Sequence, residues 1–199
     1  MKTDVKVGLL KERLTSLMDK DNRCERRRNE LTHRQNILFK ILSQVITRYS
    51  SLGFSIVFTG ERNLLCHSPL KEEKADLFSF PVPTFSIVHK VPGFRNSAEQ
   101  ESSSTLPVLL TEEVVRFYFT PNVNGNGGID YRFEEFIPGV SYAATGYLSW
   151  QSKSMLDDGD YWHFNVSPSE GLQNRPVDLE CVEEWLTRMY TRNAMIPKQ

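Results

Sequence analysis

The sequence predicts an α+β protein, with a long N-terminal coiled-coil helix, a mainly antiparallel β-sheet head and a C-terminal helix. Apolar residues recur at helical spacing through the first fifty residues, and the first proline is Pro69. Between residues 54 and 166, short β-branched and aromatic stretches alternate with turn residues. The last apolar stretch, from Leu179 to Tyr190, returns to helical spacing. The order of these three patterns gives the fold class.

The long helix carries a heptad pattern. Steps of four and three residues from Leu10 to Leu52 reach thirteen positions, of which ten are apolar. A period of 3.5 residues sustained over so many turns is typical of a left-handed coiled coil. The polar exceptions, Asp21, Arg28 and Gln35, share one heptad position, as a register-setting polar layer does. We therefore predict a seam formed by Leu10, Leu14, Leu17, Leu31, Leu38, Leu42 and Val45.

The same pattern leaves one alternative open, which is a long amphipathic helix folded back on its own domain. In both cases the helix should end before Gly53, which follows two serines and Leu52 and suits the left-handed cap position. This boundary divides the chain into a coiled-coil helix, residues 1–53, and a globular head, residues 54–199.

The head begins with two short stretches of strand composition, residues 54–58 and 63–67. Turn-forming residues lie between them at 60–63, so we predict a hairpin. Strand composition returns at residues 77–89, interrupted by Pro81 and Pro83. Proline has no N–H group to give to a sheet, so we predict an edge strand or a bulge there.

A polar segment follows, and then a second hairpin. Residues 93–105 are poor in structure-forming residues, so we predict a disordered loop. Residues 114–119 and 129–136 are strand-like and are joined by a stretch rich in glycine and asparagine. Two further strands are expected at residues 142–150 and 161–166.

The last helix has a clear start. Asp178 precedes its apolar stripe and is the expected N-cap, because a side-chain carboxylate can accept from the free N–H groups of the first turn.

Composition restricts the class of protein. Hydrophobic residues make up 39% and charged residues 25% of the 199 residues, as in soluble globular proteins. No apolar run approaches the roughly 18 residues of a membrane span, so no membrane association is expected. The N-terminus does not resemble a secretory signal, and the three cysteines are far apart without CxxC pairing. We therefore expect an intracellular protein, nuclear or cytoplasmic, with free thiols.

The net charge of −1 conceals an asymmetry. Residues 1–54 contain twelve Lys and Arg against six Asp and Glu, whereas residues 55–199 contain twelve against nineteen, giving +6 and −7. Arg26, Arg27 and Arg28 lie at the centre of the basic block and are candidates for contact with nucleic acid. The alternative is that interleaved charges keep a coiled coil soluble and in register.

No motif for catalysis, cofactor or metal binding is complete. The loop Asn124-Gly125-Asn126-Gly127-Gly128 lacks the GK[ST] ending of a phosphate-binding loop and joins two strands, so we interpret it as a hairpin turn. Cys66 and His67 are adjacent in a predicted strand and therefore point to opposite faces. We expect no enzyme activity, no cofactor and no metal site.

The layout resembles the globular-headed coiled-coil proteins of kinetochores and chromosome segregation. Heptads up to Leu52, the strand GFSIVF directly after them and the closing helix from Leu179 to Tyr190 carry the resemblance. The monopolin subunit and outer-kinetochore subunits with RWD-like heads are examples. The resemblance implies a dimeric adaptor that works in the nucleus during the cell cycle. No residue-level signature accompanies it, so it assigns no functional residue.

Two hypotheses from different classes follow. The first is a non-enzymatic dimeric adaptor that pairs with itself or a homologous coiled-coil chain and binds a protein partner on the head. Interface centres favour aromatic and arginine anchors, so the candidate partner-binding residues are Arg116, Tyr118, Tyr131 and Arg132. Alternation places Arg116 and Tyr118 opposite Phe117 and Phe119, so we expect this set to face outward. The alternative is that Tyr118 and Tyr131 are ordinary cross-strand packing. The second is a nucleic-acid-binding or viral-type structural protein whose basic helix contacts phosphates.

Overall fold

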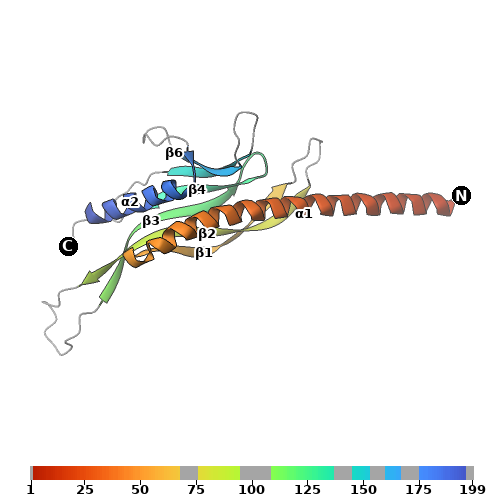
Figure 1. The fold of residues 1–199 in the computed structure, drawn as a ribbon. Coiled ribbons are helices and arrows are strands. Elements are labelled where there is room, and N and C mark those ends of the chain that lie inside the picture. Colours follow the sequence, from red (N-terminus) through yellow and green to blue (C-terminus); the bar gives the residue numbers. More distant parts are fainter. Residues whose placement is uncertain are drawn as a thin grey trace, which may run out of the picture.

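The computed structural model describes residues 2–67, 76–94, 109–136, 145–152, 160–166 and 175–195. Helix α1 (Lys2–Arg48) and a short 3-10 helix, η1 (Ser50–Leu52), lead into the sheet, and helix α2 (Leu179–Met195) follows it. The strands are β1 (Phe54–His67), β2 (Leu77–Phe94), β3 (Leu109–Val123), β4 (Ile129–Phe136), β5 (Thr145–Gln151), β6 (Tyr161–Val166) and β7 (Arg175–Pro176). The predicted order of a long helix, an antiparallel sheet and a terminal helix is confirmed (Figure 1).

The sheet is a meander. Each described strand pairs antiparallel with the next one along the chain, in the order β1 to β7. The predicted hairpin of β3 and β4 is confirmed, with Val123 opposite Ile129. Its turn is closed by the N–H of Asn124, which donates to the carbonyl oxygen of Gly128 at 3.0 Å. Gly127 has φ +65°, a backbone region that favours glycine.

The predicted hairpin at the start of the head is wrong. Residues 54–67 form one continuous strand, which pairs with β2 from Phe54 to His67. The register shifts between Phe58 and Gly60, which marks a bulge. A bulge inserts one extra residue without reversing the chain, so turn-type residues there did not produce a turn.

The two prolines lie in β2 where that strand has a neighbour on one side only. β3 pairs with β2 from Phe85 onward, while Pro81 and Pro83 pair only with β1. Their missing N–H groups therefore cost no bond to β3, and the bulge of β1 lies opposite Thr84. The prediction of an edge position or a bulge is confirmed. β2 also extends through Phe94, so the first two residues of the predicted loop belong to a strand, and residues 95–105 lie outside the described residues.

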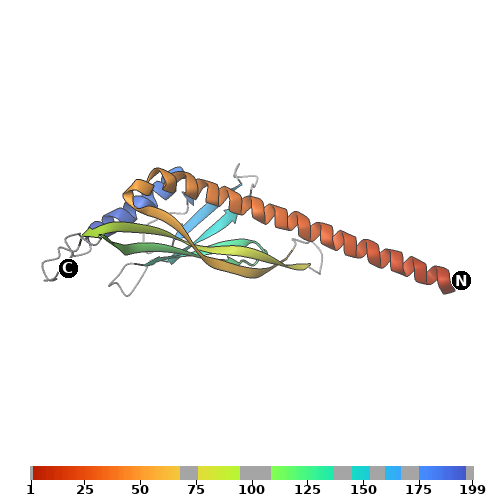
Figure 2. The same ribbon diagram turned by 90° about the horizontal axis from the view of Figure 1, so that it is seen from below.

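Both helices pack on one face of the sheet and form the core with it (Figure 2). The sheet curves around α1, because α1 contacts strands near both of its edges. Phe39 lies 5.5 Å from Phe58 of β1 between ring centroids, and Trp162 of β6 donates its indole N–H to the carbonyl oxygen of Arg34 at 2.7 Å. Part of α1 is therefore enclosed by its own head.

The helix ends are close to those predicted. α1 ends at Arg48, and after η1 the chain turns at Gly53, which has φ +90°. The backbone N–H of Cys181 donates to Asp178 Oδ1 at 2.8 Å, so the predicted cap of α2 is confirmed. The stripe of α2 enters the core through Val182, Leu186 and Met189, whereas Tyr190 is exposed.

The predicted seam is divided between two environments. Leu31, Leu38, Leu42 and Val45 are at most 1% exposed and belong to the intramolecular core. Their assignment to an intermolecular seam is wrong in this structure, because the sheet and α2 already cover them. The folded-back alternative describes this half of the helix. The other three seam leucines, Leu10, Leu14 and Leu17, are exposed.

Candidate interaction site

The first half of α1, residues 2–22, projects beyond the sheet as a single helix (Figures 1 and 2). Side chains from Lys6 to Asn22 are exposed throughout. Four of the apolar residues in this segment are spaced three and four residues apart. This spacing places the four side chains on one face of the helix. This set, called the bare stripe below, consists of Val7 (50% exposed), Leu10 (64%), Leu14 (53%) and Leu17 (51%).

The bare stripe continues the same heptad row that the head buries. Cys24 is buried at the point where α1 meets the sheet, and Leu31 and Leu38 follow on the same row. Up to Leu17 the row is uncovered, and from Cys24 onward the head covers it. A contiguous exposed apolar face of this kind is typical of an interaction site.

The helix is fixed where it leaves the head. Arg23 Nη2 lies 2.8 Å from Asp76 Oδ2, directly before β2. One turn further on, the guanidinium of Arg28 lies over the ring of Phe78, 5.3 Å from its centroid. These contacts hold the direction in which residues 2–22 project. The bare stripe therefore lies on a helix whose base is anchored to the head by these two contacts.

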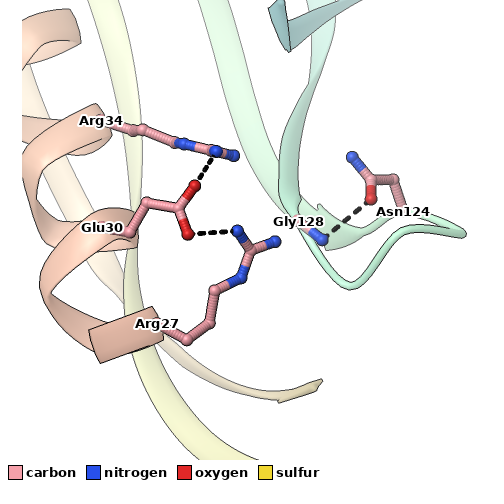
Figure 3. A network of polar contacts seen from close by, with 5 residues as sticks. All are labelled: Arg27, Glu30, Arg34, Asn124 and Gly128. Carbon is pink, nitrogen blue, oxygen red and sulfur yellow. Dashed lines mark hydrogen bonds and ion pairs between the residues drawn. The ribbon is translucent and has the colours of Figure 1, made fainter. Parts of the chain in front are cut away.

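A partly buried polar network follows in the next two turns of α1 (Figure 3). Arg27 Nη1 donates to Glu30 Oε2 at 2.6 Å, and Arg34 Nη2 donates to Glu30 Oε1. The guanidinium of Arg34 also lies over the ring of Trp150, at 5.1 Å from the centroid. Burial lowers the pKa of Arg34, and the neighbouring Glu30 opposes this shift. Figure 3 shows both arginines directed toward the β3–β4 turn, where Gly128 N–H donates to Asn124 Oδ1 at 2.9 Å.

The three consecutive arginines do not form one basic surface. Arg27 is 6% exposed and paired with Glu30, so its assignment as a nucleic-acid contact is wrong in this structure. Arg28 lies over Phe78 and 3.6 Å from Glu25, and Arg26 is exposed. Successive helical residues point about 100° apart, which explains their separate environments. Contact of Arg26 and Arg28 with nucleic acid stays a prediction.

The face of the sheet turned away from the helices carries a second candidate surface, called the outer face below. Arg116 lies 5.9 Å from the ring centroid of Tyr118, whose ring in turn meets that of Phe136 at 6.4 Å. Arg132 forms an ion pair with Glu134 at 2.8 Å on the same face. The neighbours Phe117 and Phe119 point into the core, as predicted from strand alternation. Arg116, Tyr118 and Arg132 therefore point outward as expected.

Tyr131 does not lie on the outer face, so its assignment as a partner-binding residue is wrong in this structure and the alternative of cross-strand packing describes it. Its side chain is completely buried, with its ring 5.3 Å from Phe85 and 5.8 Å from Trp162. Burial raises the pKa of its phenol. Sequence reasoning missed two exposed aromatic residues of this face, Phe136 and Tyr147. Alternate residues of a strand point to opposite faces, and Phe136 is five positions from Tyr131. Once Tyr131 is known to point into the core, Phe136 is expected to point outward.

The cysteines and His67 have packing roles in the structure. Cys66 and Cys181 are buried, and burial raises the pKa of both thiols, that of Cys181 to about 11. Both are therefore neutral thiols at neutral pH, whereas a nucleophile needs the thiolate. The imidazole of His67 lies against Gly127, where an added Cβ would collide with it. Within the described residues no three His, Cys, Asp or Glu side chains gather in the manner of a metal site.

Comparison with known proteins gave no matching family model, no similar curated protein and no similar solved structure. None of the helices in the described part of the chain is apolar over a length that could cross a bilayer. The bare stripe and the outer face are therefore the two features of the described chain from which a function can be inferred.

Proposed function

We propose that this chain is a non-enzymatic adaptor whose projecting helix pairs with another helix. The observation that carries the proposal is the bare stripe on α1, exposed on a single helix that the head holds at its base. The row of Leu10 and Leu17 becomes core from Cys24 onward, at Leu31 and Leu38, so one apolar row continues from the projecting segment into the head. In the first half of the helix these apolar side chains are exposed, and a partner helix would cover them.

Physical chemistry favours a covered stripe. The projecting part is about 30 Å long at the usual helical rise, and helices in water gain most of their stability from packing an amphipathic face. Covering a half-exposed valine or leucine contributes roughly 1 kcal/mol or more for each side chain. Val7, Leu10, Leu14 and Leu17 together therefore supply a substantial driving force for pairing.

The outer face of the sheet gives the adaptor a second place to bind. Arg116, Tyr118, Arg132 and Phe136 combine arginine and aromatic side chains, the types enriched at interface centres. They lie on the face that neither helix covers. An adaptor with two such surfaces links a helical partner to a second protein.

The alternative hypothesis, binding of nucleic acid by the basic helix, has less support. The predicted contacts were Arg26, Arg27 and Arg28, and these do not share one accessible face because Arg27 is buried against Glu30. The role in chromosome segregation stays a prediction from layout alone. That layout assumed a coil that continues to Leu52, whereas here only the residues before Arg23 project and the rest of α1 packs on the head.

Site-specific photo-crosslinking tests the pairing. A photoreactive residue in place of Leu14, in the full-length chain in its native cells, should give a crosslinked adduct of defined mass. The same residue in place of Ser16 is the control, because Ser16 is exposed about 200° away around the helix. Adducts from neither position, or equal adducts from both, would contradict pairing through the bare stripe.

A further inference from the structure

The flanks of the bare stripe differ in charge. With Leu10 and Leu17 at heptad position d and Val7 and Leu14 at a, the g positions hold Lys6, Arg13 and Lys20. These three side chains, called the basic row below, are exposed, and none forms an ion pair within the described part of the chain. The other flank, position e, holds Lys11 and Met18. Between Lys6 and Cys24 neither position g nor position e holds an acidic residue.

A second copy of this chain fits the basic row poorly in the parallel orientation. There, each g residue faces the next e residue of the partner helix. Lys6 would face Lys11 of the second copy, which is repulsive, Arg13 would face Met18, and Lys20 would face Glu25, the one attractive pair. Parallel pairing also places position a of the two helices opposite each other, so the two Asp21 carboxylates would meet in the seam.

The antiparallel orientation is no better for a second copy. Positions of the same flank then face each other, and the basic row would lie opposite another basic row. Like charges at such positions destabilise pairing. The apolar residues favour pairing, whereas the basic row opposes antiparallel self-pairing and the two Asp21 carboxylates oppose parallel self-pairing.

We propose that the bare stripe binds a helix of a different chain, with apolar a and d positions and acidic residues on the flank that faces the basic row. This inference rests on the proposed function and specifies its partner. Lys6, Arg13 and Lys20 would each meet a carboxylate, so charge selects among helices that the apolar stripe alone would accept. Exposed pairs of this kind are individually weak and screened by salt.

Two synthetic helical peptides test the choice of partner. Both have the same length and the same leucine and isoleucine residues at a and d, one with Glu and the other with Lys at e and g. Binding to the full-length chain is measured by fluorescence anisotropy at low and high salt. We expect about tenfold tighter binding of the Glu peptide, since the basic row and Lys11 form four favourable pairs in place of four unfavourable ones, with a smaller difference at high salt. Equal affinity for the two peptides would overturn the inference.

Charge reversal of the basic row supplies the matched variant. The chain with Lys6→Glu, Arg13→Glu and Lys20→Glu should prefer the Lys peptide. The chain with Arg26→Glu and Lys40→Glu is the control, because both residues are exposed on α1 outside the basic row. Its preference for the Glu peptide should remain. Loss of that preference in the control would show that overall charge, not the basic row, selects the peptide.

Light scattering separates failure of this inference from failure of the proposed function. One outcome is a purified chain that is dimeric, becomes monomeric with Leu14→Asp and binds neither peptide. Such a chain pairs with a second copy of itself. The proposed function then stands, and the inference about the partner is wrong. A monomeric chain that binds neither peptide and gives no adduct at position 14 refutes both.

Discussion

Trp162 donates its indole N–H to the backbone carbonyl oxygen of Arg34 at 2.7 Å, joining β6 to the middle of α1. The two residues are 128 positions apart, and Trp162 is almost completely buried. This contact and the pairing of Phe39 with Phe58 hold α1 between the two edges of the sheet. The helix is therefore part of the head from Arg23 onward and projects only before it.

Trp162→Phe should destabilise the chain. The ring of Phe still packs in the core, but the hydrogen bond to Arg34 is lost and a small void remains. We expect the free energy of unfolding to fall by about 1–2 kcal/mol in urea titrations. Trp150→Phe is the comparison at a partly exposed position in the neighbouring strand. An unchanged midpoint for Trp162→Phe would show that this bond contributes nothing.

Two glycines of the same chain should respond to alanine with opposite signs. Gly53 has φ +90°, and a Cβ there would collide with the carbonyl oxygen of Lys90. Gly8 lies inside α1 with open space around it. Gly53→Ala should therefore lower the free energy of unfolding by more than about 2 kcal/mol.

Gly8→Ala should instead increase the helix content of the projecting segment, by about 0.5–1 kcal/mol of helix stability. Thermal unfolding and circular dichroism measure the two effects. A loss of helicity with Gly8→Ala would contradict the helical state of residues 2–22.

His89 should make stability depend on pH. Its ring is buried, stacks on Phe54 at 4.2 Å between centroids, and its Nε2 lies 3.1 Å from the carbonyl oxygen of Leu52, which requires Nε2–H to donate. Burial lowers the pKa of His89 below its ordinary value of 6.5, and the hydrogen bond to Leu52 opposes this only in part. As pH falls below that ordinary value, the unfolded chain takes up a proton that the folded chain resists.

Stability should therefore be complete above the unfolded pKa and be lost progressively as pH falls toward the folded pKa of His89. Urea titrations at several pH values between 7.5 and 5, compared with His89→Gln, measure this contribution. The variant should be less stable at high pH and should lose less stability on acidification. Parallel curves for the two chains would exclude His89 as the source of the pH dependence.

Glu135 should be more important for stability than its neighbour Glu134. Glu135 is 1% exposed and lies 2.9 Å from Arg188 and 3.0 Å from Arg192, so it ties β4 to α2. The side chains of Arg188 and Arg192 are 25% and 38% exposed, so water partly solvates their charges when the Glu135 charge is removed. Glu135→Gln weakens both contacts and should therefore lower the free energy of unfolding by about 1–2 kcal/mol. Glu134→Gln, which loses only the exposed pair with Arg132, should change it by less than about 0.5 kcal/mol.

Local signals in the sequence predicted most of the fold. The cap at Asp178, the glycine at position 53 and the hairpin of β3 and β4 depend on neighbouring residues and were predicted correctly. The bulge near Gly60 was missed because a bulge and a turn use the same residue types. Local chemistry does not distinguish a strand that bends from one that reverses.

The site depended on information that periodicity does not contain. Leu17 and Leu38 occupy the same heptad position, yet Leu17 is 51% exposed and Leu38 is completely buried. A period of 3.5 specifies an apolar stripe but not whether the head or another chain covers it. Tyr131 and Phe136 show the same limit in a strand, since alternation separates two faces without identifying the inner one.

Leu14 and Leu38 should therefore give opposite results when each is replaced by Asp. Leu38→Asp places a charge in the core, where it has no room and no partner, and should unfold the head or lower its stability by more than about 4 kcal/mol. Leu14 is half-exposed on the projecting helix, so Leu14→Asp should change the unfolding free energy of the isolated chain by less than about 0.5 kcal/mol. The same variant should abolish binding of the Glu peptide, while Ser16→Asp, on another face of the helix, should retain it. Urea titration and fluorescence anisotropy on the same preparations measure both effects. A Leu38→Asp variant of unchanged stability would contradict the intramolecular packing of α1, and peptide binding that survives Leu14→Asp would exclude the bare stripe as the contact.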